Sequence, residues 1–359
     1  MMRIEDIDKN LKVDTDIAES DLIWLDAKQA PFSLHGTFYD ENQQCYVRMP
    51  QAIADSVSRG ISNLNRFPAG GRIRFQTDSS FIGFRFVQKN RDLSPQNTLL
   101  GMSGFDLYRS IDGGQETYFK SLIPPMGITE GFSSPVKTDG RMAEYTLNFP
   151  IYDTVCEVYI GLKKNARLSA SNPYAHAVPI LFYGSSITQG GCASRPGNTY
   201  QAMLSRSLKT DFINLGFSGQ GKAEPQMVAY LAERCKNASA FVCNYDWNAP
   251  TAEYLEKTHL PLYRTVREKN PNLPILFLSE PQILLDPKAM GPRMEIIRST
   301  YETAKAEGDE LVWFLPGDKI YEGPHWDTCT VDGCHPNDLG FYRMAMAMEP
   351  YLKEMLHLN

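Results

Sequence analysis

The sequence lacks any concentration of positive charge. It contains 36 Lys and Arg against 42 Asp and Glu, which gives a formal net charge of -6, and its basic residues form no local cluster. Proteins that bind nucleic acid or anionic lipid surfaces present a basic patch. We therefore expect neither nucleic acid nor a membrane surface among the partners of this protein.

Long apolar runs are also missing. No stretch approaches the roughly 20 apolar residues that a membrane-spanning helix needs. The N-terminal segment MMRIEDIDKNLKVDTDIAES is polar and acidic, and it has no apolar core of the kind found in secretory signals. These features predict a cytoplasmic protein, an expectation that a signal removed from the sequence would reverse.

Neither cysteine nor histidine occurs in a disulfide or metal-binding pattern. The seven cysteines are odd in number and show no framework spacing, so we expect reduced, mostly buried thiols. The histidines outside the candidate site show neither ligand spacing among themselves nor C-x-x-C partners, and no phosphate-cradling glycine motif is present. We expect no metal and no cofactor.

The 359 residues suit two domains, each large enough for its own core. From about 20 to 165 the apolar residues mostly recur at every second position, as in Ile73 and Phe75, and turn residues such as Asp112-Gly113-Gly114 separate the runs. Amphipathic helices fit poorly here, because Gly, Pro and β-branched residues interrupt every window. We predict an N-terminal β-sandwich or jelly-roll domain over residues 1–168.

A different pattern follows the aperiodic, polar stretch 163–178, which we interpret as a linker. Short apolar runs then alternate with segments of helical period, and this alternation predicts an α/β domain over residues 178–359, with a parallel sheet between two helical layers. The predicted strands are 179–183, 211–215, 240–244, 273–278 and 311–315. The predicted helices are 199–209, 223–236, 251–269, 289–307 and 338–357.

Residues with catalytic potential follow the predicted strands, where a parallel sheet binds its ligands. Ser186 follows the first strand, Gly219 the second and Asn248 the third, while Asp332 and His335 lie beyond the fifth. Each one alone has an ordinary explanation as a helix cap, a loop former or an incidental residue. Together at one edge of one sheet, they indicate a serine nucleophile, oxyanion donors and a carboxylate–histidine pair.

Three segments carry a family resemblance. YGSSITQGGCASRPGNTY, NLGFSGQG and DGCHPNDLGFYRMA, together with Asn248, resemble the four blocks of the SGNH/GDSL hydrolase superfamily. The segment Gly104-Phe105-Asp106-Leu107-Tyr108 matches the Gly-x-Asp-Leu-Tyr signature of the β-rich N-terminal domain in one GDSL subgroup. The resemblance extends over nearly the whole chain after residue 20. It implies esterase chemistry on a three-layer, flavodoxin-like α/β/α sheet.

The resemblance also implies roles for single residues. Ser186 would attack an acyl carbonyl, His335 would accept its proton, and Asp332 would orient His335. The backbone N–H groups of Ser186 and Gly219 and the side chain of Asn248 would hold the oxyanion. Some relatives work as Ser–His dyads, so the need for Asp332 stays open.

The sequence departs from the family pattern in two places. Ser185 stands where the GDSL motif has its acidic residue, so a role that rests on that carboxylate is absent. The third block reads Asp246-Trp247-Asn248-Ala249 instead of Gly-x-Asn-Asp. Asn244, inside the preceding strand, is the weaker alternative to Asn248.

The sequence gives weaker evidence for the substrate than for the reaction. Trp247 and Trp326 lie near the candidate blocks and would suit stacking on a sugar ring, although packing explains them equally well. No long apolar lid is evident, and esterases with an attached β-sandwich often deacetylate sugars, so we expect O-acetylated oligosaccharides as substrates. A lipid or thioester acyl hydrolase and a catalytically silent carbohydrate-binding protein are the alternatives.

Arg195 is expected to pair with a structural acid such as Glu280, or else to meet a polar substrate. Whether the N-terminal domain binds carbohydrate stays open, and so does homo-oligomerisation.

Overall fold

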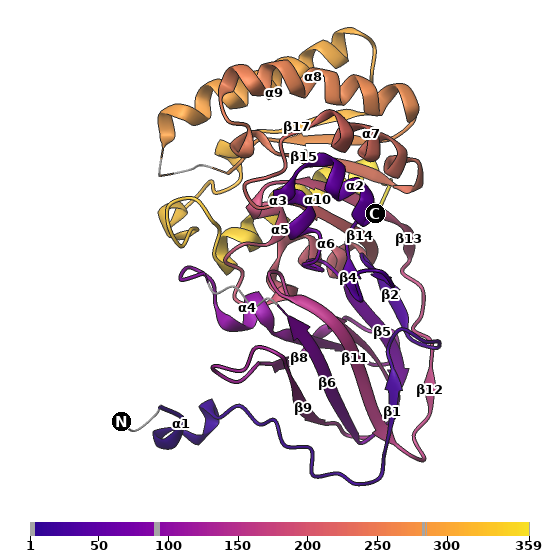
Figure 1. Ribbon diagram of the computed structural model, residues 1–359. Helices are drawn as coiled ribbons and strands as arrows, with labels where there is room; N and C mark the ends of the chain where they lie inside the picture. The colour runs from indigo at the N-terminus through magenta and orange to yellow at the C-terminus, as the bar shows by residue number, and fades with distance from the viewer. Residues whose placement is uncertain (1–3, 90–93, 282–283, 285, 359) are drawn as a thin grey trace.

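The chain folds into an antiparallel β half and an α/β half, which occupy the bottom and the top of Figure 1. The computed structural model describes residues 4–89, 94–281, 284 and 286–358. Short helical segments α1 (Ile4–Ile7) and η1 (Lys9–Leu11) precede the first strand.

Two antiparallel sheets form the N-terminal half. The first has the strand order β1-β11-β6-β9, and the second has the order β12-β5-β10-β7-β8 with β2 also paired to β5. The first sheet comprises β1 (Leu22–Asp26), β11 (Thr154–Lys163), β6 (Phe81–Lys89) and β9 (Gly131–Lys137). The second comprises β12 (Leu168–Ser169), β5 (Arg72–Thr77), β10 (Ala143–Asn148), β7 (Phe105–Ser110), β8 (Thr117–Leu122) and β2 (Ser33–His35). A separate hairpin pairs β3 (Phe38–Asp40) with β4 (Cys45–Val47).

The alternating pattern of the sequence explains this sandwich. Leu147 of β10 lies opposite Ile73 of β5 on one side and Leu107 of β7 on the other, and all three are fully buried. In the facing sheet, Ile160 of β11 lies opposite Phe84 of β6. These side chains belong to one apolar cluster, because period-two residues from both sheets point to the same interior. The predicted β-sandwich is confirmed.

Three short helices in this region were not predicted. They are α2 (Gln51–Val57), α3 (Arg59–Leu64) and α4 (Leu99–Ser103). Ala54 and Ile61, from α2 and α3, are buried in the same cluster as the α/β sheet, and Figure 1 shows these indigo helices among the elements of the upper half. One or two turns cannot establish a helical period in the sequence, and contacts with the other half of the chain stabilise them instead.

All five strands of the C-terminal sheet are parallel, in the order β14-β13-β15-β16-β17. This is the order of a flavodoxin-like sheet. The strands are β13 (His176–Gly184), β14 (Thr210–Gly216), β15 (Ala240–Asn244), β16 (Ile275–Leu278) and β17 (Val312–Leu315). The helices are α5 (Ser186–Gln189), α6 (Tyr200–Leu208), α7 (Pro225–Arg234), α8 (Ala252–Lys269), α9 (Pro287–Ala306) and α10 (Asp338–Met355). The remaining turns are η2 (Pro196–Asn198), η3 (Cys235–Asn237), η4 (Asp246–Asn248), η5 (Gly317–Lys319) and η6 (Trp326–Thr328).

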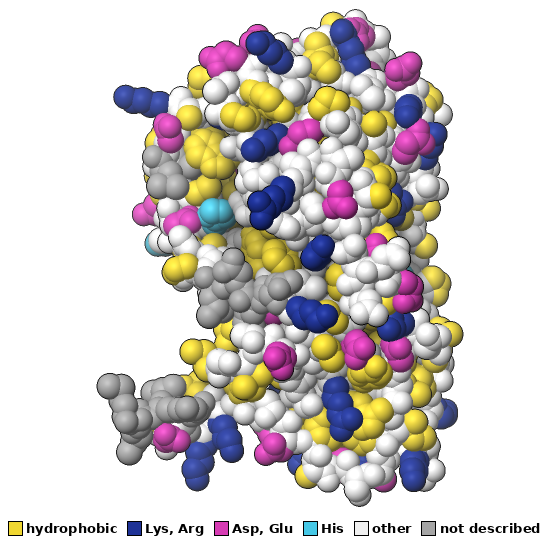
Figure 2. All heavy atoms as spheres, viewed as in Figure 1, with side chains coloured by type: hydrophobic (Ala, Val, Ile, Leu, Met, Phe, Trp, Pro, Cys, Tyr) yellow, Lys and Arg dark blue, Asp and Glu magenta, His cyan; other side chains and the backbone are white. Residues whose placement is uncertain are grey.

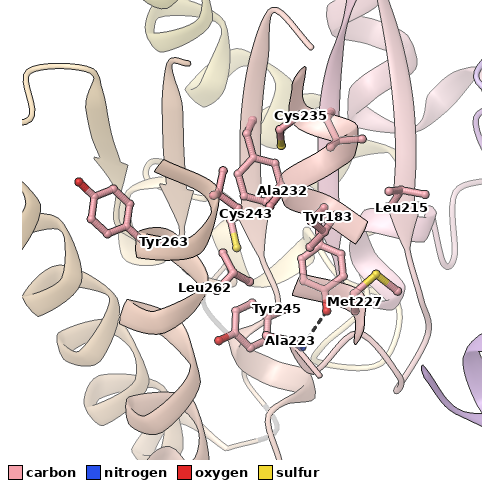
Figure 3. Packing of buried hydrophobic residues seen from close by; sticks show 14 of the residues in the cluster. Tyr183, Leu215, Ala223, Met227, Ala232, Cys235, Cys243, Tyr245, Leu262 and Tyr263 are labelled. Atoms are coloured by element: carbon pink, nitrogen blue, oxygen red, sulfur yellow. Dashed lines mark hydrogen bonds between the residues drawn. The ribbon is translucent and has the colours of Figure 1, made fainter. Parts of the chain in front are cut away.

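Helices cover both faces of this sheet. One apolar cluster joins the sheet to α7, α8 and α9, and a second joins the opposite face to α6 and α10. Figure 3 shows part of the first cluster, in which the phenol oxygen of Tyr183 accepts a 2.8 Å hydrogen bond from the backbone N–H of Ala223. The predicted three-layer α/β/α architecture is confirmed.

The predicted linker 163–178 is partly ordered into strands. It contains β12, which pairs with β5 of the sandwich, and it includes the start of β13, where His176 pairs with Thr210. The aperiodic sequence hid both because neither pairing needs an apolar side chain.

The cysteines are buried thiols, as the sequence predicted. All seven are free. Within the described ranges, none of the helices combines the length and the apolar character needed to cross a bilayer.

Candidate active site

Ser186 begins α5, directly after the sharp turn that ends β13. Gly184 has no space for a side chain, because an added Cβ would lie 2.1 Å from the backbone oxygen of Asn244. Ser185 caps the short helix through its hydroxyl oxygen, which accepts a 3.1 Å hydrogen bond from the N–H of Ile187. The tight strand-to-helix turn fixes Ser186, whose side chain is largely buried.

A chain of hydrogen bonds connects Ser186 to the loop before α10. Oγ of Ser186 lies 2.9 Å from Nε2 of His335, and Nδ1 of His335 lies 2.8 Å from Oδ2 of Asp332. The imidazole therefore meets a hydroxyl on one ring nitrogen and a carboxylate on the other. This arrangement can move a proton from the hydroxyl to the imidazole while the carboxylate stabilises the charged ring.

The carboxylate of Asp332 is held by its own loop. Oδ1 accepts hydrogen bonds from the backbone N–H of His335, at 2.8 Å, and from that of Cys334, at 3.0 Å. Partial burial alone would raise the pKa of Asp332, but these hydrogen bonds and the one from the His335 ring outweigh it and lower the pKa below the ordinary value. Asp332 is therefore a carboxylate throughout the neutral range.

Gly219 and Asn248 lie on neighbouring loops at the same sheet edge. Gly219 has φ of 65°, a left-handed backbone that favours glycine. Within the described part of the chain, its N–H group has no hydrogen-bond partner. Nδ2 of Asn248 donates a 2.9 Å hydrogen bond to the carbonyl oxygen of Phe217, which leaves its second N–H for another acceptor.

Asn244, the weaker alternative, is engaged inside the fold. Its Nδ2 donates to the carbonyl oxygen of Leu278 at 3.0 Å, and its Oδ1 lies 3.4 Å from the hydroxyl of Thr188. It connects β15 to its neighbours.

A cavity of about 430 Å³ opens beside His335 between the two halves. At this level of the molecule, Figure 2 shows hydrophobic side chains exposed at the surface. The N-terminal half supplies most of the wall: Leu64, Phe67, Ser94, Gln96, Asn97, Met102 and Tyr152. The α/β half supplies Gly191, Cys192, Ser218 and His335.

The two tryptophans lie outside this lining. Trp247 is half-buried, and its ring lies 5.6 Å from the guanidinium of Arg293. Trp326, in η6, is 40% exposed. Among the described residues that form the cavity wall, neither tryptophan is present.

Comparison with known proteins places this site in a family. The model of the GDSL-like Lipase/Acylhydrolase family matches residues 177–353, and the GxDLY model, the N-terminus of SGNH hydrolase-type esterases, matches residues 22–168. The chain belongs to the GDSL-like lipase/acylhydrolase family. It is accordingly a carboxylic ester hydrolase with a GxDLY N-terminal region.

Solved structures of the same fold cover nearly the whole chain. A Bacteroides ovatus ATCC 8483 protein assigned as a GDSL-like lipase is 27% identical, with a TM-score of 0.84 over 94% of this chain and 99% of its own. The salicylyl-acyltransferase SsfX3 from a tetracycline biosynthetic pathway is 16% identical, with a TM-score of 0.76 over 94% and 98%. The acetyl xylan esterase Est2A from the rumen bacterium Butyrivibrio proteoclasticus is 14% identical, with a TM-score of 0.58 over 94% and 99%. At these identities the last two show a shared fold alone. No curated protein matches the chain.

The GxDLY signature contacts the GDSL domain directly. Asp106, fully buried in β7, accepts hydrogen bonds from Nη1 of Arg195 at 2.9 Å and from the N–H of Gly197 at 2.8 Å. The hydroxyl of Tyr108 accepts a 2.6 Å hydrogen bond from the same Arg195 nitrogen. Arg195 therefore pairs with a structural acid, as expected, but this acid is Asp106 of the GxDLY half and not Glu280.

The GxDLY half lines much of the cavity of this GDSL protein, and the sequence did not predict this contribution. The hydroxyl of Tyr152 lies 3.5 Å from Oγ of Ser218, next to Gly219. Nothing around Leu64, Phe67, Met102 or Tyr152 resembles a catalytic motif, because apolar wall residues carry no spacing signal. Only the docking of the two halves identifies them.

In residues 4–89, 94–281, 284 and 286–358, no group of three or more His, Cys, Asp or Glu side chains has the arrangement of a metal site.

Proposed function

We propose that this protein is a serine esterase that removes acetyl groups from O-acetylated oligosaccharides. Ser186 is the nucleophile, His335 the general base and acid, and Asp332 the residue that orients His335. The observation that carries the proposal is the hydrogen-bonded series Ser186–His335–Asp332, whose histidine lines an interdomain cavity. Residues 1–168 form one wall of that cavity, and residues 178–359 carry the chemistry.

The reaction proceeds in two halves. Oγ of Ser186 attacks the acyl carbonyl carbon while its proton passes to Nε2 of His335. The tetrahedral intermediate then expels the sugar oxygen, which takes that proton and leaves as the alcohol. Water attacks the acetyl-Ser186 ester with His335 again accepting the proton, and its return to Oγ releases acetate and free Ser186.

Three donors are proposed for the negative oxygen of each intermediate. They are the backbone N–H groups of Ser186 and Gly219 and the amide Nδ2 of Asn248. The unpartnered Gly219 N–H and the anchoring of Asn248 on Phe217 support this assignment. Loss of one such donor typically lowers kcat by about 100- to 1000-fold.

The mixed character of the cavity wall supports a sugar ester. Leu64, Phe67 and Met102 offer apolar surface, while Gln96 and Asn97 offer amide groups. A pyranose ring has apolar C–H faces and hydroxyl edges, so it matches such a wall. The acetyl xylan esterase of the same fold supports the same substrate class. Stacking on Trp247 or Trp326 would concern sugar units beyond this cavity.

Acetate release from a panel of acetylated xylo-, manno- and gluco-oligosaccharides tests the proposal. The wild type is compared with Ser186→Ala and with Ser207→Ala, a change at an exposed serine of α6. We expect release by the wild type and Ser207→Ala and none by Ser186→Ala. Turnover of longer acyl esters or thioesters alone would show that the substrate is not an acetylated sugar. Sugar binding without any turnover would indicate a lectin-like function and no esterase activity.

A further inference from the structure

Two carboxyl side chains are buried together behind the nucleophile. Glu280 follows the end of β16, and Asp246 begins η4, the turn that ends at Asn248. Both side chains are completely inaccessible to solvent. Neither takes part in the acyl-transfer steps described above, and burying two acids side by side costs free energy unless hydrogen bonds or protonation compensate for the lost water.

Glu280 contacts the nucleophile turn. Its Oε1 accepts a hydrogen bond from the hydroxyl of Ser185. The oxygen of that hydroxyl accepts from the N–H of Ile187 at 3.1 Å, so one serine side chain connects Glu280 to both sides of Ser186. The Glu280 carboxyl is thus one residue removed from the attacking oxygen.

Asp246 connects the same glutamate to the oxyanion loop. Its two carboxylate oxygens accept from the backbone N–H of Glu280 at 3.2 and 3.1 Å. The Asp246 carbonyl and that of Ala249 both accept from Nη1 of Arg293, which fixes the turn around Asn248. Ser185, Glu280 and Asp246 therefore bridge the turn that carries Ser186 and the turn that carries Asn248.

The protonation state of Glu280 follows from its surroundings. Burial, and after it the charge of Asp246, raises the pKa of Glu280 well above the ordinary value. Oε2 of Glu280 makes no hydrogen bond of ordinary length to a described residue, and the hydrogen bonds from the Ser185 and Asn244 side chains offset the rise in the pKa only in part. The other titratable groups that face Glu280 are Tyr200, Tyr321 and Cys334.

We propose that Glu280 is a positioning residue for the esterase, holding the Ser186 turn and the Asn248 turn in fixed relation through Ser185 and Asp246. From the loop after β16, it supplies the acid that this sequence lacks at position 185. The inference rests on the proposed function. It assigns Glu280 no contact with the substrate, so its loss lowers kcat and leaves KM nearly unchanged.

Three variants test this role: Glu280→Ala, Glu280→Gln, and the double variant Ser185→Asp/Glu280→Ala, which moves the carboxyl group to residue 185. The readouts are kcat and KM for p-nitrophenyl acetate and the rate at which a fluorophosphonate modifies Ser186. We expect Glu280→Ala to lower kcat and the modification rate by about 100-fold, the typical effect of a displacement near 1 Å at reacting groups. The double variant should regain much of that loss, and Glu280→Gln, which mimics the protonated acid, should retain most activity.

The pH profile separates positioning from a general loss of stability. In the wild type, ionisation of Glu280 at high pH puts a second charge beside Asp246 and lowers kcat; Glu280→Gln should lack this alkaline loss. If Glu280→Ala fails to fold, the fall of kcat at alkaline pH is compared between the wild type and Glu280→Gln. The same alkaline fall in both proteins overturns the proposal. Unchanged modification of Ser186 in a folded Glu280→Ala also overturns it, whereas a wild type that the fluorophosphonate never modifies overturns the proposed function itself.

Discussion

The carboxylate of Asp106 lies 2.9 Å from the guanidinium of Arg195, across the boundary between the GxDLY half and the GDSL half. The same carboxylate accepts from the N–H of Gly197, and its other oxygen accepts from Nδ2 of Asn148 at 2.8 Å. The central residue of the GxDLY signature thus binds the loop that leads from α5 into α6. These contacts explain the signature by docking of the two halves.

Asp106→Asn should therefore destabilise the whole protein. The change leaves the largely buried Arg195 without a counter-charge, and breaking a buried ion pair in this way costs about 3–5 kcal/mol. Urea denaturation measures the free energy of unfolding. The control is Glu295→Gln, which removes an exposed pair with Arg298 and should change the free energy by no more than about 1 kcal/mol. Equal effects of the two variants would contradict the docking role of Asp106.

Arg48→Met should weaken the contact between the halves at a second place. Arg48 is almost fully buried, and its guanidinium donates to the carbonyl oxygens of Leu64, Asn214 and Gly216. No acid among the described residues forms an ion pair with it. Each carbonyl left unpaired costs about 1–3 kcal/mol. Because Gly216 leads into the loop of Gly219, we also expect a lower kcat.

Unfolding curves and p-nitrophenyl acetate turnover measure both effects of Arg48→Met. Arg59→Met, at an exposed position of α3, serves as the control and should behave as wild type. A stable Arg48→Met variant with wild-type kcat would show that the GxDLY half does not support the oxyanion loop.

Asp332→Asn tests whether the site needs its carboxylate. Asparagine keeps the size of the side chain but cannot stabilise a charged His335, so kcat should fall by about 100- to 10,000-fold, the usual contribution of acid–base catalysis. The pKa of Asp332 is lowered from its ordinary value of 3.8, so its contribution to stability is present above that value and is lost as the pH falls through the lowered pKa. Asp332→Asn should lack this acid-dependent loss. A fall in kcat of less than about threefold, small against that usual contribution, would instead indicate a Ser–His dyad.

Leu64→Trp should narrow the interdomain cavity and discriminate between substrates. Leu64 is the last residue of α3 and lines the cavity. The indole ring of a tryptophan at this position obstructs an oligosaccharide but leaves room for a small aryl ester. We expect kcat/KM for the acetylated oligosaccharide to fall at least tenfold, or about 1.4 kcal/mol, with little change for p-nitrophenyl acetate. Ile23→Trp, at an exposed position of β1, is the control. Equal losses for both substrates would place sugar binding elsewhere.

The sequence allowed most of the framework to be predicted, because periodicity reports which faces are buried. The helix predicted at 251–269 is α8, Ala252–Lys269, and the strand predicted at 240–244 is β15, Ala240–Asn244. The residues at the strand ends could be named because a parallel sheet brings its carboxyl ends to one edge.

The remaining features depend on contacts that no local pattern records. Helices α2 and α3 are too short to show a period, and they exist because they pack on the other half of the chain. Three of these features join residues that are far apart in the sequence. They are the ion pair of Arg195 with Asp106, the cavity wall around Tyr152 and the contact of Glu280 with Ser185. A carboxyl group missing from one position can thus be supplied from another loop, and motif comparison does not detect such a replacement.

Trapping the acyl-enzyme tests the central claim most directly. Wild-type protein would be mixed with p-nitrophenyl acetate, quenched in acid within the first turnover, digested and examined by mass spectrometry, with Ser186→Ala and Ser207→Ala treated in parallel. We predict one acetyl group on the peptide that contains Ser186 in the wild type and in Ser207→Ala, and none in Ser186→Ala. Acetate release without acetylation of Ser186, or acetylation at another residue that persists in Ser186→Ala, would contradict the account.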